Sequence, residues 1–546
     1  MSPSLALRPA FLLAASVALT SVAFAQQPAP EPRTVMERSK WTTYTPYDSM
    51  MTYLQDVQKR STEMRLGFYG ETWEGRRLPY LIFSRPLVAE PWEAAALGKP
   101  VVVLAANVHG GERTLRESVL ILTRELATRG SEANRLLDDL VIIVVPQINP
   151  DGFFARTRGN LWGIDLNRDY IKLEQPEIAS YVKNIINTWH PHLFIDGHNG
   201  GAQPYNIAYQ CASHADPDPR ITEMCDREIF PAINARLAPQ GMKGFYYTGG
   251  NATRWNTGGF EARIGRNYGG FANSIGILFE SPSQSIEQGV RAGVLSYKAV
   301  IEYVQRNSQK VLTLVNTARR ETILMGQEPR GQIVVRQRYG PEDWPVTYQI
   351  RAVQPDTGWR TIRSDSLMKK PVPTLTRARP YAYVLPRDAR DAVAMLRRHN
   401  IVVEELTDAI STPVQAYVID TIRHEAQYNH AAATVVVVDS VITVTRSFPR
   451  GSFVVRTGQM LGRVAAHMLE AESTDNVIYW NTMDAWLPRA AVGGGGGGRG
   501  GRGGGRGAGG GRAGGDDQPQ QAAGGQWLVP IFKVMQPTAF PARIVE

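Results

Sequence analysis

The sequence predicts an α/β fold, in which a mostly parallel or mixed sheet is covered by helices on both faces and is followed by a C-terminal α/β accessory region. Two observations support this fold class. Apolar runs of strand length alternate with amphipathic helical segments through about the first 310 residues. Several of these predicted strands also end in a histidine or a glutamate, where open α/β sheets bind their ligands.

The stretch from Val101 to Leu126 shows the pattern most clearly. Val101–Ala106 is an apolar run with the length of a buried strand. A glycine-bearing turn follows, and apolar residues then recur at helical spacing at Leu115, Val119, Leu122 and Leu126. His109 and Glu112 lie at the junction, three residues apart, so that both side chains can point to one place.

The same reasoning assigns the other elements of this region. Helices are expected over Tyr47–Arg60, Pro176–Thr188 and Ile286–Gln305, and strands over Leu78–Phe83, Leu140–Val145, His192–Ile195 and Ser274–Phe279. The segments Gly70–Gly75 and Pro146–Phe153 are expected to be turns, and Arg156–Tyr170 a polar loop.

The first 25 residues have the pattern of a secretory signal peptide. Arg8 precedes an apolar run from Ala10 to Val22, and the small-residue sequence AFA ends at Ala25, before Gln26. The apolar run is too short for a membrane span, and no later stretch is long and apolar enough for one. The sequence therefore predicts a secreted or periplasmic protein, with cleavage after Ala25.

The predicted export determines what the two cysteines can form, and the net charge bears separately on possible partners. In an oxidising compartment Cys211 and Cys225 can form a disulfide, and buried free thiols are the equal alternative. The net charge of +9 is small for 546 residues, so it argues against nucleic acid as a partner.

Four residues of the first region suggest a zinc site. His109, His198 and Glu280 each stand at or just beyond the end of a separate predicted strand, and Glu112 follows His109 by one turn. A catalytic zinc takes three protein ligands and keeps one position open. His109, Glu112 and His198 supply two imidazoles and a carboxylate, which leaves Glu280 as a general base.

The motifs HGGE, NPDG, DLNR, the later His198 and a final FE resemble the zinc metallocarboxypeptidases, the carboxypeptidase A-like enzymes, over roughly residues 40–310. The resemblance implies one zinc ion per chain, held by His109, Glu112 and His198, and hydrolysis of C-terminal peptide residues by zinc-activated water. It implies that Asn167 and Arg168 bind the free C-terminal carboxylate of a peptide. It also implies that Arg158 polarises the scissile carbonyl and that Glu280 is the base.

Several assignments remain open at this stage. Arg156 is a rival to Arg158, and His190, His192 and His214 are further candidate ligands, of which the first two are interpreted as surface or structural residues. The family usually closes a tyrosine over the substrate, and Tyr246, Tyr247 and Tyr268 are all candidates. An amidase or deacylase acting on cell-wall peptides or N-acyl amino acids, and a non-catalytic peptide-binding relative, are the alternative functions. The oligomeric state is not indicated.

The catalytic domain is expected to span residues 36–310, and residues 311–546 to form one or two accessory domains without a catalytic motif. Strands are expected at Gln332–Arg336, Val346–Val353, Tyr381–Leu385, Ile401–Leu406 and Thr434–Thr445, and helices at Asp388–Arg398 and Gln459–Leu469. The run Gly493–Gly515 is almost pure glycine with spaced arginines, and it predicts a disordered insertion at about 490–525.

Overall fold

The computed structural model describes residues 31–201, 204–250, 255–342, 346–351, 358–364, 367–488 and 525–546. The predicted signal peptide and the run Gly493–Gly515 lie outside these residues.

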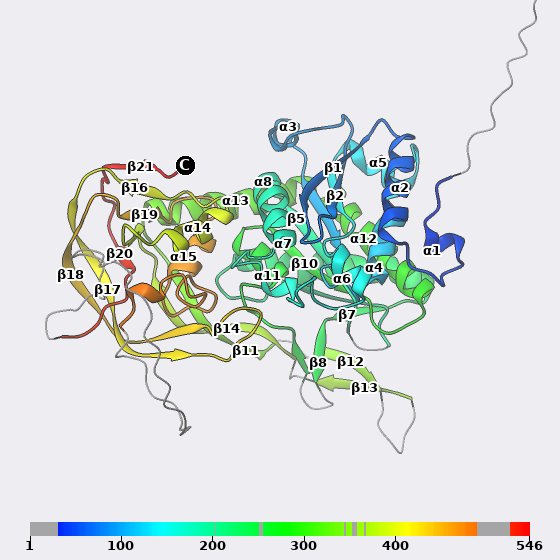
Figure 1. Ribbon diagram of the computed structural model, residues 1–546. Coiled ribbons are helices and arrows are strands. Elements are labelled where there is room, and N and C mark those ends of the chain that lie inside the picture. Colours follow the sequence, from blue (N-terminus) through cyan, green and yellow to red (C-terminus); the bar gives the residue numbers. More distant parts are fainter. Residues whose placement is uncertain are drawn as a thin grey trace, which may run out of the picture. The chain divides into compact units, whose positions relative to one another are not determined.

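Figure 1 shows the helices and strands of the described chain and labels most of them. The helices are α1 (Val35–Arg38), α2 (Tyr47–Gln58), α3 (Pro91–Ala96), α4 (Thr114–Ala127), α5 (Glu132–Arg135), α6 (Pro150–Ala155), α7 (Pro176–Tyr181), α8 (Asn187–Trp189), α9 (Pro219–Met224), α10 (Phe230–Leu237), α11 (Gly265–Phe271), α12 (Ile286–Arg306), α13 (Ser308–Gln327), α14 (Arg390–Arg398) and α15 (Gly462–Leu469). The strands of the first region are β1 (Met64–Glu71), β2 (Arg77–Phe83), β3 (Val101–Ala106), β4 (Val141–Val145), β5 (Leu193–His198), β6 (Ile207–Cys211), β7 (Gly244–Tyr246), β8 (Thr248–Gly250), β9 (Trp255–Thr257) and β10 (Ile275–Glu280).

The first region is built on an eight-stranded mixed sheet with the order β1-β2-β4-β3-β5-β10-β6-β7. Its four central strands, β4, β3, β5 and β10, run parallel to one another. Neighbours on both sides, β2 and β6, are antiparallel to them. The predicted mixed sheet is confirmed, and the parallel centre places the carboxyl ends of β3, β5 and β10 at one edge.

Alternate residues of the central strands pack into two different hydrophobic layers, as the period of a strand requires. Val101, Val103 and Ala105 face the layer with α7 and α11, whereas Val102 and Leu104 face the layer with α2, α4, α10 and α12. The central strands are buried along their whole length. The sheet is therefore covered by helices on both faces, as the sequence predicts.

Two local predictions in this region differ from the structure in part. Residues 146–153 were expected to be a turn, but α6 begins at Pro150 because the Asn149 side chain caps the backbone N–H of Gly152 and proline occupies the first helical position. The turn predicted at Gly70–Gly75 is present between β1 and β2, although its first two residues still belong to β1, an edge strand that pairs only with β2.

The C-terminal region is dominated by antiparallel sheet. Its strands are β11 (Gln332–Pro341), β12 (Val346–Arg351), β13 (Trp359–Ser364), β14 (Leu367–Ala378), β15 (Ala382–Leu385), β16 (Glu404–Leu406), β17 (Ile410–His424), β18 (Thr434–Phe448), β19 (Phe453–Arg456), β20 (Phe532–Val534) and β21 (Ala542–Ile544). Seven of them form a sheet with the order β18-β17-β20-β15-β19-β16-β21. β11 and β14 instead join β9 and β8 of the first region in a four-stranded sheet.

The boundary at residue 310 stays a prediction. Helix α12 ends at Arg306 and α13 begins at Ser308, so only Asn307 separates the two helices. A single layer of buried apolar residues also continues from one face of the eight-stranded sheet into α14, α15 and the seven-stranded sheet. The two regions consequently share part of their core.

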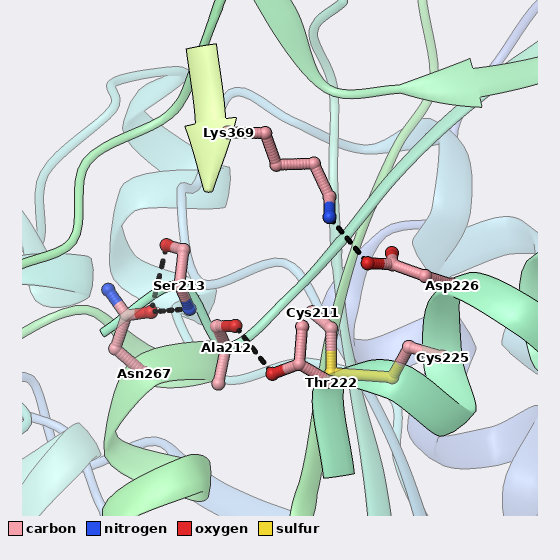
Figure 2. The surroundings of a disulfide bond; sticks show 8 residues. All are labelled: Cys211, Ala212, Ser213, Thr222, Cys225, Asp226, Asn267 and Lys369. Atoms are coloured by element: carbon pink, nitrogen blue, oxygen red, sulfur yellow. Dashed lines mark hydrogen bonds and ion pairs between the residues drawn. A yellow bond between two sulfur atoms is a disulfide. The ribbon is translucent and has the colours of Figure 1, made fainter. Parts of the chain in front are cut away.

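Cys211 and Cys225 form a disulfide, shown in Figure 2. The bond joins the end of β6 to the helical segment that follows α9, and both residues are almost completely buried. The loop between them is also held by a hydrogen bond from the Thr222 hydroxyl to the Ala212 carbonyl, 3.1 Å long. Of the two alternatives that the sequence allows, the structure has the disulfide.

Removing this disulfide is expected to destabilise the fold. The bond closes a loop with a sequence separation of 14 residues, and a loop of this size is worth about 3 kcal/mol through the entropy of the unfolded chain. We expect Cys211→Ala/Cys225→Ala to lower the free energy of unfolding in urea by about this amount. The wild type in reductant should match the double variant, and an unchanged midpoint in both cases would contradict the prediction.

Candidate active site

The candidate metal ligands come from two adjacent parallel strands. His109 and Glu112 lie in the turn between β3 and α4, and His198 is the last residue of β5. Glu280 is the last residue of β10, directly paired with His198 in the parallel register. The fold thus brings together the three residues that the sequence places at strand ends and Glu112, one turn after His109.

The two imidazoles and the carboxylate converge on one point. The Nδ1 atoms of His109 and His198 are 3.1 Å apart, and each lies 2.9–3.0 Å from an oxygen of Glu112. Among the described residues, this is the one group of three or more histidine, cysteine or acidic side chains with ligand atoms close enough to hold a metal ion. Two imidazole nitrogens and one carboxylate are a donor set that suits zinc.

Two further carboxylates orient the imidazoles from outside. Nε2 of His109 is hydrogen-bonded to Oδ1 of Asp165 at 2.9 Å. Nε2 of His198 lies 2.8 Å from Oδ2 of Asp196, two residues earlier on β5. A proton on Nε2 of each ring leaves the Nδ1 lone pair directed at the metal position. Asp165 and Asp196 thus hold the two imidazoles in the orientation that a metal ion requires.

Asp165 and Asp196 were missed as site residues, although the sequence carries a signal for each. Asp165 is the first residue of the DLNR motif. Asp196 and His198 are two positions apart in a strand, so both side chains lie on the same face.

Glu280 has the properties of a base next to this site. Its side chain is buried, and its Oε2 atom has no hydrogen-bond partner among the described residues. Burial raises the pKa of Glu280 to about 8, and the negative charges of Glu112 and Asp196 add to this effect. A Cβ atom at residue 200 would lie 2.6 Å from Oε2, so a larger residue than Gly200 would displace the carboxyl group from this position.

Arg158 contacts the metal-binding carboxylate and its support. Its Nη1 atom donates to Oε1 of Glu112 at 3.0 Å and its Nε atom to Oδ2 of Asp165 at 3.1 Å, while more than half of the side chain remains exposed. Arg156 instead ends helix α6 in a left-handed backbone conformation, with its side chain exposed. The geometry favours Arg158 over its rival.

Asn167 and Arg168 lie in the 3-10 turn Leu166–Arg168 that follows Asp165. The Asn167 side chain accepts a hydrogen bond from the Gly265 backbone at 2.9 Å, and its Nδ2 atom lies 3.4 Å from Nε2 of His198. Arg168 donates to the Asn167 carbonyl, and it forms no ion pair with any described carboxylate. A guanidinium left unpaired beside the metal site can bind an anionic group.

The three candidate tyrosines have different surroundings. Tyr268 is buried, with its hydroxyl hydrogen-bonded to Nδ1 of His399, and Tyr246 packs against Tyr209 and Phe230. Tyr247 directly follows β7, and the negative charge of Glu280 is the main cause that raises its pKa, with burial second. Tyr247 is therefore the candidate that lies near the base.

The other histidines have structural roles. Nδ1 of His192 accepts a hydrogen bond from the Val101 backbone, and His190 adopts a left-handed conformation at the end of α8. His214 is buried against Phe271, and its Nδ1 atom accepts from the Asp216 backbone. None of the three belongs to the metal-binding group.

The loop that carries DLNR is also held by the C-terminal region. The backbone N–H of Asp165 donates to the Asn429 side chain at 3.3 Å. His430 pairs with Glu174 at 2.9 Å. Arg263, whose carbonyl accepts a hydrogen bond from the Tyr170 backbone, forms an ion pair with the buried Asp475 at 3.1 Å. The C-terminal region thus positions residues of the candidate active site.

A His–Glu–His set with a buried glutamate beside it, at the carboxyl edge of a sheet, is the arrangement of single-zinc hydrolases. Residues 50–262 match the family model described as zinc carboxypeptidase. Through this region the chain is similar to the zinc carboxypeptidases.

The chain is also similar to individual carboxypeptidases. It is 25% identical to carboxypeptidase 2 of Trichophyton rubrum over 441 residues, which are 75% of this chain and 78% of that protein. It is 30% identical to the human carboxypeptidase N catalytic chain over 154 residues, 25% of this chain and 31% of that one. A crystal structure of a metallo-carboxypeptidase from Burkholderia cenocepacia covers 48% of this chain and 70% of its own, with 21% identity and a TM-score of 0.39.

Proposed function

We propose that this protein is a zinc metallocarboxypeptidase that removes residues from the C-terminus of peptides. The observation that carries the proposal is the convergence of His109, Glu112 and His198 beside the buried carboxyl group of Glu280, whose Oε2 atom has no partner among the described residues. The family model and the carboxypeptidase relatives support it.

Each residue around the zinc position has a separate role in the proposed reaction. A bound zinc ion would supply a Lewis acid that polarises the peptide carbonyl and lowers the pKa of water. Oε2 of Glu280 takes a proton from the attacking water and later delivers it to the leaving amine, which a carboxyl group with a raised pKa can do at neutral pH. Arg158 stabilises the negative charge that develops on the carbonyl oxygen.

Two residues read the free C-terminus. The guanidinium of Arg168, which pairs with no described carboxylate, binds the terminal carboxylate through its planar fork, and the amide of Asn167 donates a further hydrogen bond. Tyr247, near Glu280, closes over the bound residue. These roles make a free carboxylate the feature that selects the substrate.

The test compares blocked dipeptides with their C-terminal amides. The wild type should contain about one zinc per chain and cleave only the free-carboxylate peptide, because the amide offers no anion to Arg168. Arg168→Ala should lower kcat/KM for the free peptide by about 100-fold, as expected for loss of a charged anchor, and should remove most of the preference over the amide.

The outcomes separate the alternatives. Equal cleavage of amides, or cleavage of N-acyl amino acids alone, would make the protein an amidase or deacylase. Binding of peptides without turnover would make it a binding protein. Arg156→Ala is the matched control, since this exposed arginine contacts neither the metal ligands nor Asp165, and it should keep the wild-type preference.

We also propose that the protein is exported and that the mature chain begins at Gln26. The sequence of residues 1–25 supports this proposal. Among the described residues, none of the helices is long and apolar enough to cross a bilayer. N-terminal sequencing of the protein recovered from the periplasm or medium tests the cleavage site.

A further inference from the structure

A cluster of exposed apolar side chains lies on the loops around the candidate active site. Trp73, Phe154, Leu161 and Trp162 are exposed by 50%, 77%, 43% and 66%. They come from three segments: the turn between β1 and β2, the end of α6, and the loop that leads to Asp165. Large apolar side chains gathered at one exposed place mark a binding surface. We call these four residues the aromatic rim.

The aromatic rim has a fixed geometry, because a ring contact and hydrogen bonds hold its two tryptophans. The rings of Trp73 and Trp162 meet edge to face with their centroids 6.4 Å apart. Nε1 of Trp73 donates to Oε1 of Gln175 at 3.2 Å, and the same oxygen accepts from Nδ2 of Asn160 at 2.8 Å. Asn160 in turn accepts a hydrogen bond from the backbone of Trp162. The two indoles are therefore held in place while their faces stay in water.

Phe154 joins the rim through the turn that carries Trp73. The guanidinium carbon of Arg76 lies 5.2 Å from the centre of the Phe154 ring. Arg76 and Thr72 both bind the buried carboxylate of Asp151 in α6, the Thr72 hydroxyl at 2.9 Å. This pairing fixes the turn against the helix that ends beside Phe154.

The rim is continuous with the metal site through its backbone. Leu161 and Trp162 lie between Arg158, which donates to Glu112, and Asp165, which binds His109. The start of the same loop pairs with the glycines next to His109, since the backbone N–H of Gly111 donates to the Thr157 carbonyl at 2.7 Å. The turn that carries Trp73 precedes β2, which is antiparallel to β4, so this turn also lies at the sheet edge that carries His198 and Glu280.

We propose that the aromatic rim binds the apolar residues of the peptide upstream of the bond that is cleaved. The inference rests on the proposed function. In the proposed function the cleaved bond lies beside Arg158 and the zinc ligands, and Leu161 and Trp162 belong to the same loop as Arg158, so the residues upstream of that bond are within reach of the rim. Rigid aromatic side chains bind apolar side chains at a small cost in conformational entropy. The rim makes the enzyme selective for peptides with apolar residues before the cleaved one.

The experiment measures kcat/KM for two hexapeptides that share their last two residues. One has leucine and phenylalanine at the upstream positions and the other has glycine and serine. The wild type should prefer the apolar peptide by at least about tenfold, and Trp162→Ala and Trp73→Ala should each remove most of that preference. Circular dichroism verifies that the variants, changed at exposed positions, are folded.

Trp92→Ala is the matched control. Trp92 is 68% exposed, but it lies in α3 and lines a cavity with Val101 and His192, at the amino ends of β3 and β5, opposite the zinc ligands. The preference for the apolar peptide should be unchanged in this variant. If Trp92→Ala lowered the preference as much as Trp162→Ala does, the effect would come from the loss of any exposed tryptophan and not from a binding site at the rim.

Several results would overturn the proposal. It is wrong if the wild type cleaves both hexapeptides equally well, or if the rim variants keep the preference. The rim would instead bind glycans if the wild type showed no preference between the peptides and a soluble cell-wall oligosaccharide inhibited hydrolysis. This inhibition would then be weaker in Trp162→Ala. If the wild type turns over no peptide at all, the proposed function fails, and calorimetric binding of the two hexapeptides to wild type and Trp162→Ala still decides the role of the rim.

Discussion

Glu280→Gln is expected to lower kcat by about 1,000-fold with little change in zinc content. Glutamine keeps the size of the side chain but cannot take a proton, and proton transfer by a positioned side chain contributes 10²- to 10⁴-fold to rate. Glu280 belongs to no ion pair of the described residues, and its Oε2 atom has no partner, so the exchange removes no structural contact of that atom. The measurement is steady-state hydrolysis of a blocked dipeptide, with metal content determined on the same sample.

A structural explanation of such a loss must be excluded. Glu302→Gln is the control, because Glu302 is a partly buried glutamate in α12 whose pKa is also raised by burial, and it pairs with Arg236. This variant should keep wild-type kcat. Turnover by Glu280→Gln within tenfold of the wild type would show that another group takes the proton.

Removing zinc is expected to abolish activity completely, and one equivalent of zinc per chain should restore it. Without the ion, two imidazoles and a carboxylate remain that cannot polarise a carbonyl group. His198→Ala should fail to recover activity with zinc, since two ligands hold the ion much less tightly than three. The measurements are titration of the apoprotein with zinc and the unfolding temperature, which should rise on addition of zinc because the ion binds only the folded chain.

His424→Gln controls for the loss of a histidine as such. His424 is exposed near the end of β17 and lies outside the metal-binding group, so the variant should bind zinc and hydrolyse peptides like the wild type. Full activity of a preparation that contains less than a tenth of an equivalent of any metal would contradict the zinc mechanism.

The central strands could be predicted because their apolar runs are local signals. Val101–Ala106 matches β3 residue for residue, and the strand ends that carry His198 and Glu280 follow from the same pattern. The edge strand β1 was missed because Arg65 and Gly67 interrupt its apolar residues and only one neighbour pairs with it. Pairing of β9 with β14 joins Trp255 to Leu367, and no local pattern encodes a contact over that distance in sequence.

The candidate site divides in the same way. The positions of His109, Glu112, His198 and Glu280 follow from strand ends and spacing, and the structure brings them together. The choice among the tyrosines could not be made from the sequence, because it depends on which side chain the fold places near Glu280. The role of Asn429 could not be predicted either, since this residue meets Asp165 from 264 positions away.

Asn429, His430 and Asp475 of the C-terminal region contact Asp165, Glu174 and Arg263 near the active site. These contacts constrain how the enzyme can be engineered. A chimera that takes its catalytic half from this chain and its C-terminal half from a relative would pair Asp165 and Arg263 with foreign partners. Such a graft has to carry the segments around residues 429 and 475 together with the zinc-binding half. The part of this enzyme that can be exchanged with a relative is therefore a set of segments that lie together in the fold. It cannot be delimited by a single position in the sequence.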